Sequence, residues 1–337
     1  MPVNLDALFS GQRRALAKAI TLIESTRASD RTAALSLLNA CLPRSGASFR
    51  LGISGVPGVG KSTFIETFGQ QLIQQGHRVC VLAVDPSSPK YGGSILGDKT
   101  RMERLSRADE AFIRPSPAGI TLGGVAQRTR ESILLAEAAG YDIILVETVG
   151  VGQSEHDVAS MTDCFLVLMQ PGAGDELQGI KKGILELADF IVVNKADGAL
   201  AQTAEQTRIH YKNALGVLTH SGFWTPDVHL VSATTGLGIV DLWEHLKRYQ
   251  AAAEETRDAR RQQQALDWFT RLIDEGIQHQ LLSQPRWATA LSEARERVTS
   301  AQQTPPDAAA SVLSSMISQL NHAESDHDSP IPQNPAR

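Results

Sequence analysis

The sequence predicts a doubly wound α/β domain with a mostly parallel sheet, flanked by helical segments. From residue 49 onward, short apolar runs alternate with helical stretches, and several runs are nearly continuous in Val, Ile and Leu. Strands that are apolar on both faces are typical of a parallel sheet covered by helices. The expected strands are Arg50–Ser54, Val79–Val84, Ala111–Ile113, Asp142–Glu147, Cys164–Met169, Phe190–Asn194 and Val228–Ser232.

Changes in pattern divide the chain into four parts. Residues 1–45 show helical spacing and are expected to form an N-terminal helical extension, which Pro43 interrupts. The α/β domain covers 46–250, a C-terminal helical arm 251–301, and a largely disordered tail 302–337, with one helix expected around 308–320. Trp268 and Phe269 lie in the arm, so they are expected either to pack back on the same chain or to serve dimerisation.

Composition narrows the class of protein. Of 337 residues, 42% are hydrophobic and 20% charged, as in soluble globular proteins, and the net charge of −5 gives no reason to expect nucleic acid or an acidic membrane as partner. The three separated cysteines suit buried free thiols in a reducing cytosol. The chain has no apolar run near the ~20 residues that a membrane span requires, so a cytoplasmic protein is expected.

The strongest motif is a phosphate-binding P-loop of the form G-x-x-x-x-G-K-[ST]. It lies between an expected strand and an expected helix, which is the context that the motif requires. The backbone N–H groups would surround the phosphates, while Lys61 would reach the β- and γ-phosphates and Ser62 would hold Mg²⁺. The residues are Gly55, Val56, Pro57, Gly58, Val59, Gly60, Lys61, Ser62 and Thr63.

A second motif selects guanine. Asn194, Lys195 and Asp197 form N-K-x-D at the end of a later strand. A carboxylate only accepts hydrogen bonds, so Asp197 suits the N–H donors on the N1 and 2-amino edge of guanine and disfavours adenine. Ser232-Ala233 ends the next strand and would offer a backbone N–H to the guanine carbonyl.

Acidic residues follow two other strands. Glu147 begins E-T-V-G, where small GTPases carry D-x-x-G, and a Glu still fits beside Mg²⁺, which accepts carboxylates through water. Asp85 ends an earlier strand, and Asp98 lies shortly after in the expected switch region. Either aspartate would help to hold Mg²⁺ or to position the attacking water.

Together these motifs resemble the MeaB/ArgK-type P-loop GTPases that accompany methylmalonyl-CoA mutase. The resemblance covers roughly residues 10 to 300. It is carried by AVDPSS at 83–88, GSILGDKTR at 93–101, ETVGVGQS at 147–154 and PGAGDELQGIKKG at 171–183, besides the P-loop and Asn194–Asp197. It implies a homodimer and a chaperone that governs adenosylcobalamin loading and protection of the mutase.

The resemblance also implies roles for single residues. Lys61, Ser62, Asp85, Asp98 and Glu147 would form the phosphate and Mg²⁺ site, with Lys61, Asp98 and Glu147 taking the catalytic roles. The segment from Asp175 to Lys182 would be the family's mobile loop, coupling nucleotide state to partner contact.

Two alternative functions stay open. The first is a protein kinase or ATPase linked to amino-acid transport, although the chain shows no acceptor site and Asp197 indicates guanine. The second is a metal-insertion GTPase, although the nine histidines are scattered and no Cys pair accompanies them.

Overall fold

The computed structural model describes residues 3–84, 102–115, 122–148, 154–172, 182–217, 222–282 and 284–325. Two compact units make up the chain, Met1–Arg261 and Gln262–Arg337. Among the described helices, none combines the length and apolar character that a membrane crossing requires.

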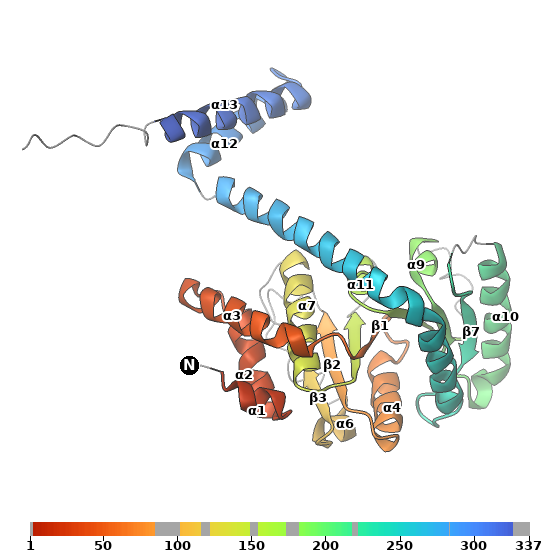
Figure 1. Cartoon of the computed structure of the whole chain (residues 1–337). Helices are drawn as coiled ribbons and strands as arrows, with labels where there is room; N and C mark the ends of the chain where they lie inside the picture. Colours follow the sequence, from red (N-terminus) through yellow and green to blue (C-terminus); the bar gives the residue numbers. More distant parts are fainter. Residues whose placement is uncertain are drawn as a thin grey trace, which may run out of the picture. The chain divides into compact units, whose positions relative to one another are not determined.

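A seven-stranded parallel sheet forms the centre of the first unit, in the order β3-β2-β4-β1-β5-β6-β7 (Figure 1). This confirms the predicted fold class. The central strand β1 has β4 on one side and β5 on the other, so the chain reverses its winding direction there. Ligands bind at such switch points, beyond the carboxyl ends of the strands. The strands are β1 Phe49–Gly55, β2 Val79–Val84, β3 Ala111–Arg114, β4 Ile143–Thr148, β5 Cys164–Met169, β6 Phe190–Val193 and β7 Asp227–Leu230.

Helices cover both faces of the sheet, and alternate strand residues fill two separate cores. One core joins the sheet to α1 Leu5–Phe9, α2 Arg13–Glu24, α3 Ala28–Cys41, α7 Leu122–Ala138, α8 Glu155–Ala159, α9 Lys182–Leu187 and α10 Ala201–Val217. The other joins it to α4 Lys61–Gln74, α6 Glu103–Arg107 and the first turns of α11 Ile239–Leu282. Short 3-10 turns lie at η1 Leu42–Arg44 and η3 Gly198–Leu200. The three cysteines are buried and free, as predicted.

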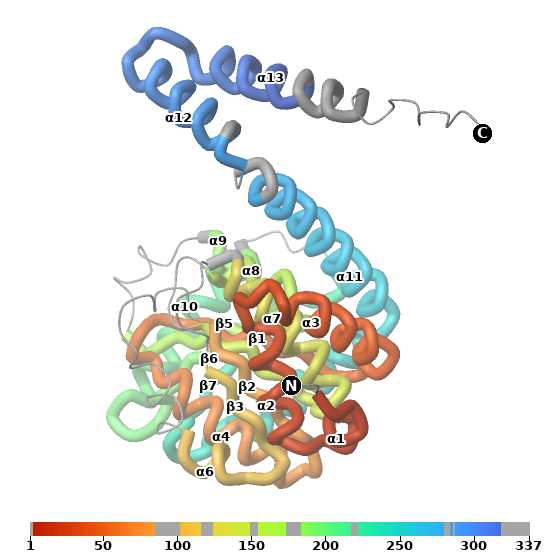
Figure 2. Tube along the Cα trace, turned by 90° about the vertical axis from the view of Figure 1, so that its left-hand side faces the viewer, coloured from red at the N-terminus to blue at the C-terminus, as the bar shows by residue number. Residues whose placement is uncertain are grey.

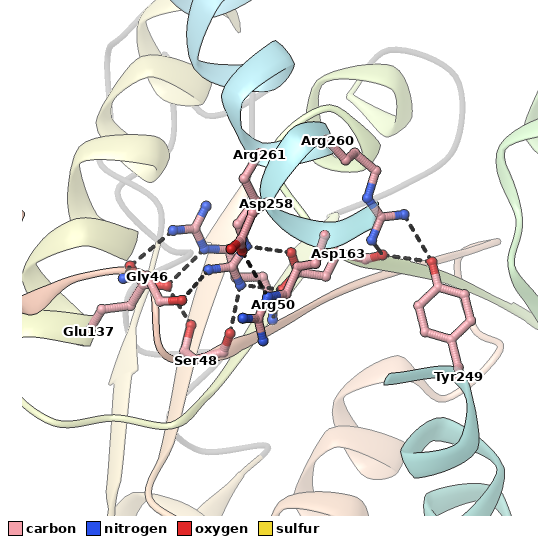
Figure 3. Close-up of polar contacts among 10 residues, drawn as sticks. Gly46, Ser48, Arg50, Glu137, Asp163, Tyr249, Asp258, Arg260 and Arg261 are labelled. Carbon is pink, nitrogen blue, oxygen red and sulfur yellow. Dashed lines mark hydrogen bonds and ion pairs between the residues drawn. The ribbon is translucent and has the colours of Figure 1, made fainter. Parts of the chain in front are cut away.

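A buried ionic network holds the first half of α11 to the amino-terminal ends of the central strands (Figure 3). Arg261 donates to both carboxylate oxygens of Asp163, at 2.7 and 2.5 Å, and to the carbonyls of Gly46 and Ser48. Glu137 accepts from Arg50 and from Ser48 beside it. Since the carboxylates of Asp163 and Glu137 are almost fully buried, each needs the arginine that faces it.

The second unit consists of the rest of α11 with α12 Pro285–Thr299 and α13 Pro305–Ser325 (Figure 2). Helix α11 runs without a break across the expected start of the arm at residue 251. The expectation of a largely disordered tail is wrong over Pro305–Ser325, where the helix exceeds the expected 308–320. The reason is packing, because Ala308, Val312 and Met316 bury against Trp287 of α12.

Asp189 gives the first unit a pH dependence. Burial raises the pKa of Asp189 from 3.8 to about 6, and the hydrogen bond from the Phe165 N–H only partly opposes this. The unfolded chain thus loses this proton at lower pH than the folded chain does. Stability therefore falls as pH rises from about 4 to 6, by up to about 3 kcal/mol at 1.36 kcal/mol per pH unit.

Asp189→Asn is expected to remove this loss, because the amide stays neutral and its oxygen still accepts from Phe165. Urea unfolding at pH 4, 5, 6 and 7 measures the effect, with the exposed Asp274→Asn as control. Identical pH profiles for the two variants would contradict the prediction.

Candidate functional site

The P-loop connects β1 to α4 at the centre of the sheet. Gly58 and Gly60 have φ of 80° and 95°, a region that favours glycine. A Cβ added at Gly60 would lie 2.8 Å from the Asn194 amide nitrogen, so this glycine also allows a close approach between two loops. Helix α4 begins at Lys61, which directs its positive end toward the loop.

Lys61 is the buried cation of this loop. Its side chain donates to the carbonyls of Gly55, at 2.5 Å, and Val56, at 3.4 Å. Burial lowers the pKa of Lys61, while the carboxylates of Glu147 and Glu155 act in the opposite direction. The ammonium is therefore held in a low-dielectric environment, where interaction with an anion is strong.

Glu147 and Glu155 are both buried. Glu147 lies in β4 and pairs with Ile53 of β1. Ile53 in turn lies two residues before the start of the P-loop. Glu155 begins α8, and sequence reasoning did not identify it as a site residue. Its position directly after ETVGVGQS was the available signal.

Asn194 joins three loops. Its amide nitrogen donates to the Val59 carbonyl at 2.9 Å, and its amide oxygen accepts from the Ala233 N–H at 3.0 Å. Both bonds are buried, so one side chain ties the P-loop to the N-K-x-D loop and to the loop after β7.

Lys195 adds a second link, since its ammonium donates to the Gly58 carbonyl at 2.8 Å. Its φ of 60° lies in the left-handed region, which is uncommon for a residue other than glycine. Asp197 follows, half-buried, as the residue before η3. Strained backbone of this kind concentrates at functional sites.

The Ser232-Ala233 loop is fixed by its neighbours. The Ala233 carbonyl accepts from the Thr67 hydroxyl of α4 at 2.6 Å, and the Ser232 hydroxyl accepts from the Thr235 N–H. The structure thus brings the P-loop, the N-K-x-D loop and the Ser-Ala loop together at one sheet edge. Asp85, Asp98 and 173–181 lie outside the described residues, as do Val149 and Gly150.

The donor set near Lys61 suits Mg²⁺. Ser62 lies in the first turn of α4, and Glu147 comes from the adjoining strand. A hydroxyl and a carboxylate are hard oxygen ligands of the kind that Mg²⁺ prefers.

Asn194→Ala is expected to destabilise the protein by about 1–3 kcal/mol, because the Val59 carbonyl and the Ala233 N–H would lose buried partners. Urea unfolding measures the loss. The exposed Asn213→Ala of α10 is the control and is expected to stay within about 0.5 kcal/mol of the unmutated chain. If the two variants unfold alike, Asn194 does not join the loops.

The parallel sheet, the P-loop at its switch point and the adjoining N-K-x-D loop define a P-loop GTPase. Comparison with known proteins gives the same class. A model of the family described as methylmalonyl-CoA mutase-associated GTPase MeaB matches residues 16–286. The chain belongs to this family, and it is a GTP-hydrolysing enzyme.

Individual relatives are similar to this chain over most of its length. A putative GTPase of Caulobacter vibrioides is 51% identical over 309 residues, which cover 91% of this chain and 94% of that protein. The mitochondrial methylmalonic aciduria type A homolog of Mus musculus is 49% identical over 291 residues, covering 82% and 70%. The crystal structure of an LAO/AO transport system kinase superimposes with a TM-score of 0.77 at 37% identity, covering 93% and 96%.

Proposed function

We propose that this GTPase is a chaperone of an adenosylcobalamin-dependent methylmalonyl-CoA mutase, and that its GTP cycle governs loading and protection of the mutase cofactor. The observation that carries the proposal is the family match over residues 16–286, since mutase association is part of that family's description. The free, buried cysteines suit a reducing compartment, and we propose the cytoplasm.

In the proposed site, each loop has one task. Lys61 would exchange its carbonyl partners for β- and γ-phosphate oxygens. Asp197 would accept hydrogen bonds from the N–H groups of the guanine edge. Asn194 would hold the three loops together. Ser62 and Glu147 would hold Mg²⁺, which neutralises phosphate charge when bound. The residues proposed for the site are Gly55 to Thr63, Asp85, Asp98, Glu147, Asn194, Lys195, Asp197, Ser232 and Ala233.

We further propose that the protein is a homodimer formed through the second unit. Leu266, Phe269, Ile273 and Ile277 recur on α11 at intervals of three and four residues, so they share one helix face. Each of them is about half exposed or more, and Phe269 reaches 62%. Apolar stripes of this spacing are typical of helix–helix interfaces, and the same stripe on a second copy would bury it.

Phe269→Glu is expected to convert the dimer to monomer in sedimentation experiments, because it would bury a charge in the stripe. The control is Leu35→Glu on α3, at another exposed apolar position. A monomeric unmutated protein, or a Phe269→Glu dimer, would exclude this interface.

Coupling to the mutase is expected to run through Pro171–Lys182. Turnover of GTP with and without an adenosylcobalamin-dependent mutase tests this. Lys181→Ala and Gln178→Ala are expected to lower the stimulated rate and leave GDP affinity nearly intact, with Lys212→Ala on α10 as control. If the mutase does not stimulate the unmutated GTPase, the mutase proposal fails; if both variants keep full stimulation, the segment is only a connector.

The kinase alternative has one supporting observation, the similarity of the chain to a solved structure that is named as a transport system kinase. It predicts that the γ-phosphate of GTP moves to an acceptor. The chaperone proposal instead predicts one inorganic phosphate for each GTP consumed. Measuring phosphate release with no acceptor present separates them.

A further inference from the structure

Three metal-ligating side chains meet at β7, the edge strand of the sheet, two of them from the strand itself and one from α11. Asp227 and His229 are two residues apart in β7, so they lie on one face of the strand. His245 lies in α11, which packs on that face. One ligand atom from each residue can be chosen so that all three lie within 4.8 Å of one another.

His229 is the fixed member of this group. Its ring lies 4.3 Å from the His245 ring and 5.6 Å from the Phe190 ring, between centroids, and its side chain is 12% exposed. Its Nε2 atom is buried and has no hydrogen-bond partner among the described residues, since the nearest Asp227 oxygen is 3.9 Å away. A buried polar atom without a partner is costly, and a ligand would satisfy it.

We infer that Asp227, His229 and His245 form a binding site for a divalent transition metal ion of the zinc type. Two imidazoles and one carboxylate are ordinary zinc ligands, and water completes a four-coordinate site of this kind. With bonds of about 2.1 Å, ligand atoms lie about 3.4 Å apart. Asp227 and His245, which are partly exposed, can close the remaining distance by side-chain rotation.

The surrounding charges permit a cation. The positive charges of Arg208 in α10 and Arg248 in α11 disfavour a cation at this site. The negative charges of Asp227 and of Asp241 in α11 favour one. Two guanidinium nitrogens of Arg208 donate to the Glu205 carboxylate, at 2.9 and 2.6 Å, so the charge of Arg208 is paired.

This site differs from the expected Mg²⁺ site. The cluster lies on the edge strand β7 and on α11, whereas Ser62 and Glu147 of the expected Mg²⁺ site belong to α4 and to β4, which three strands separate from β7. The ion would join the edge strand to α11 and stabilise the first unit. This role does not depend on the mutase proposal.

The test uses the full-length protein with saturating GDP and Mg²⁺, titrated with Zn²⁺ in a calorimeter and with Co²⁺ followed by its visible absorption. One equivalent is expected to bind, and Zn²⁺ is expected to raise Tm. His245→Gln and Asp227→Asn, at partly exposed positions, are each expected to weaken binding at least about tenfold. Exposed His210→Gln of α10 is the control and should bind as the unmutated chain does.

Two results would overturn the inference. One is absence of Zn²⁺ and Co²⁺ binding once Mg²⁺ and GDP are saturating. The other is unchanged affinity in both variants, which would place the ion elsewhere. GDP affinity, measured in parallel, is expected to be the same in every variant, so a folding failure would be recognised directly.

Discussion

Lys61→Ala is expected to lower GTP hydrolysis at least about 100-fold and to remove most of the affinity for triphosphate. Its ammonium is buried and bonded to the carbonyls of Gly55 and Val56, so it stands within the loop that would receive the phosphates. Removing one preorganised charge partner of a transition state commonly lowers the rate by that factor. Single-turnover hydrolysis of GTP measures the effect.

The fold should survive this substitution. Burial opposes the charge on Lys61, so the variant loses an unfavourable desolvation together with two hydrogen bonds. Circular dichroism and urea unfolding separate a folded, inactive protein from an unfolded one, and exposed Lys212→Ala of α10 is the matched control. Unchanged turnover in Lys61→Ala would mean that the P-loop is not the active site.

Asp197→Asn is expected to weaken GTP and GDP by about the same factor and to favour xanthine nucleotides. Each lost charge-assisted hydrogen bond is worth about 1.5–3 kcal/mol, and 1.4 kcal/mol is tenfold in affinity. The expected loss is therefore roughly 10-fold or more. Xanthine carries a carbonyl where guanine carries the 2-amino group, so it suits the amide donor of asparagine.

The structure makes this variant a clean test. Asp197 precedes η3, and its side chain makes no capping hydrogen bond to that described turn, so the substitution removes no helix cap. Exposed Asp274→Asn of α11 serves as control. Competition of GTP, ATP and xanthosine triphosphate against labelled GDP is the measurement, and equal affinity of the unmutated protein for ATP and GTP would contradict guanine selection.

The sheet was predictable because each strand carries its own signal. Val79–Val84 and Cys164–Met169 have the predicted bounds, since runs of apolar residues bury on both faces whatever their neighbours are. The other strands differ from prediction by one or two residues at one or both ends. The helix over Pro305–Ser325 was underestimated, because the packing of its apolar residues against α12 is not visible in the local pattern.

The sequence by itself determined the nucleotide chemistry. The P-loop and N-K-x-D are local patterns, in which a glycine's tolerance of positive φ or a carboxylate's acceptor character follows from the residue type. Their residue types, order and positions after strands were enough to expect guanine, phosphate and Mg²⁺ at one sheet edge.

Only the tertiary structure decided which distant side chains meet. It placed Glu155 beside Lys61, tied Asn194 to Val59 and Ala233, and set His245 against His229. These contacts join residues that are 16 to 135 positions apart in the chain. The packing of helices on the sheet creates them, and no periodicity or motif along the chain encodes a distance across it.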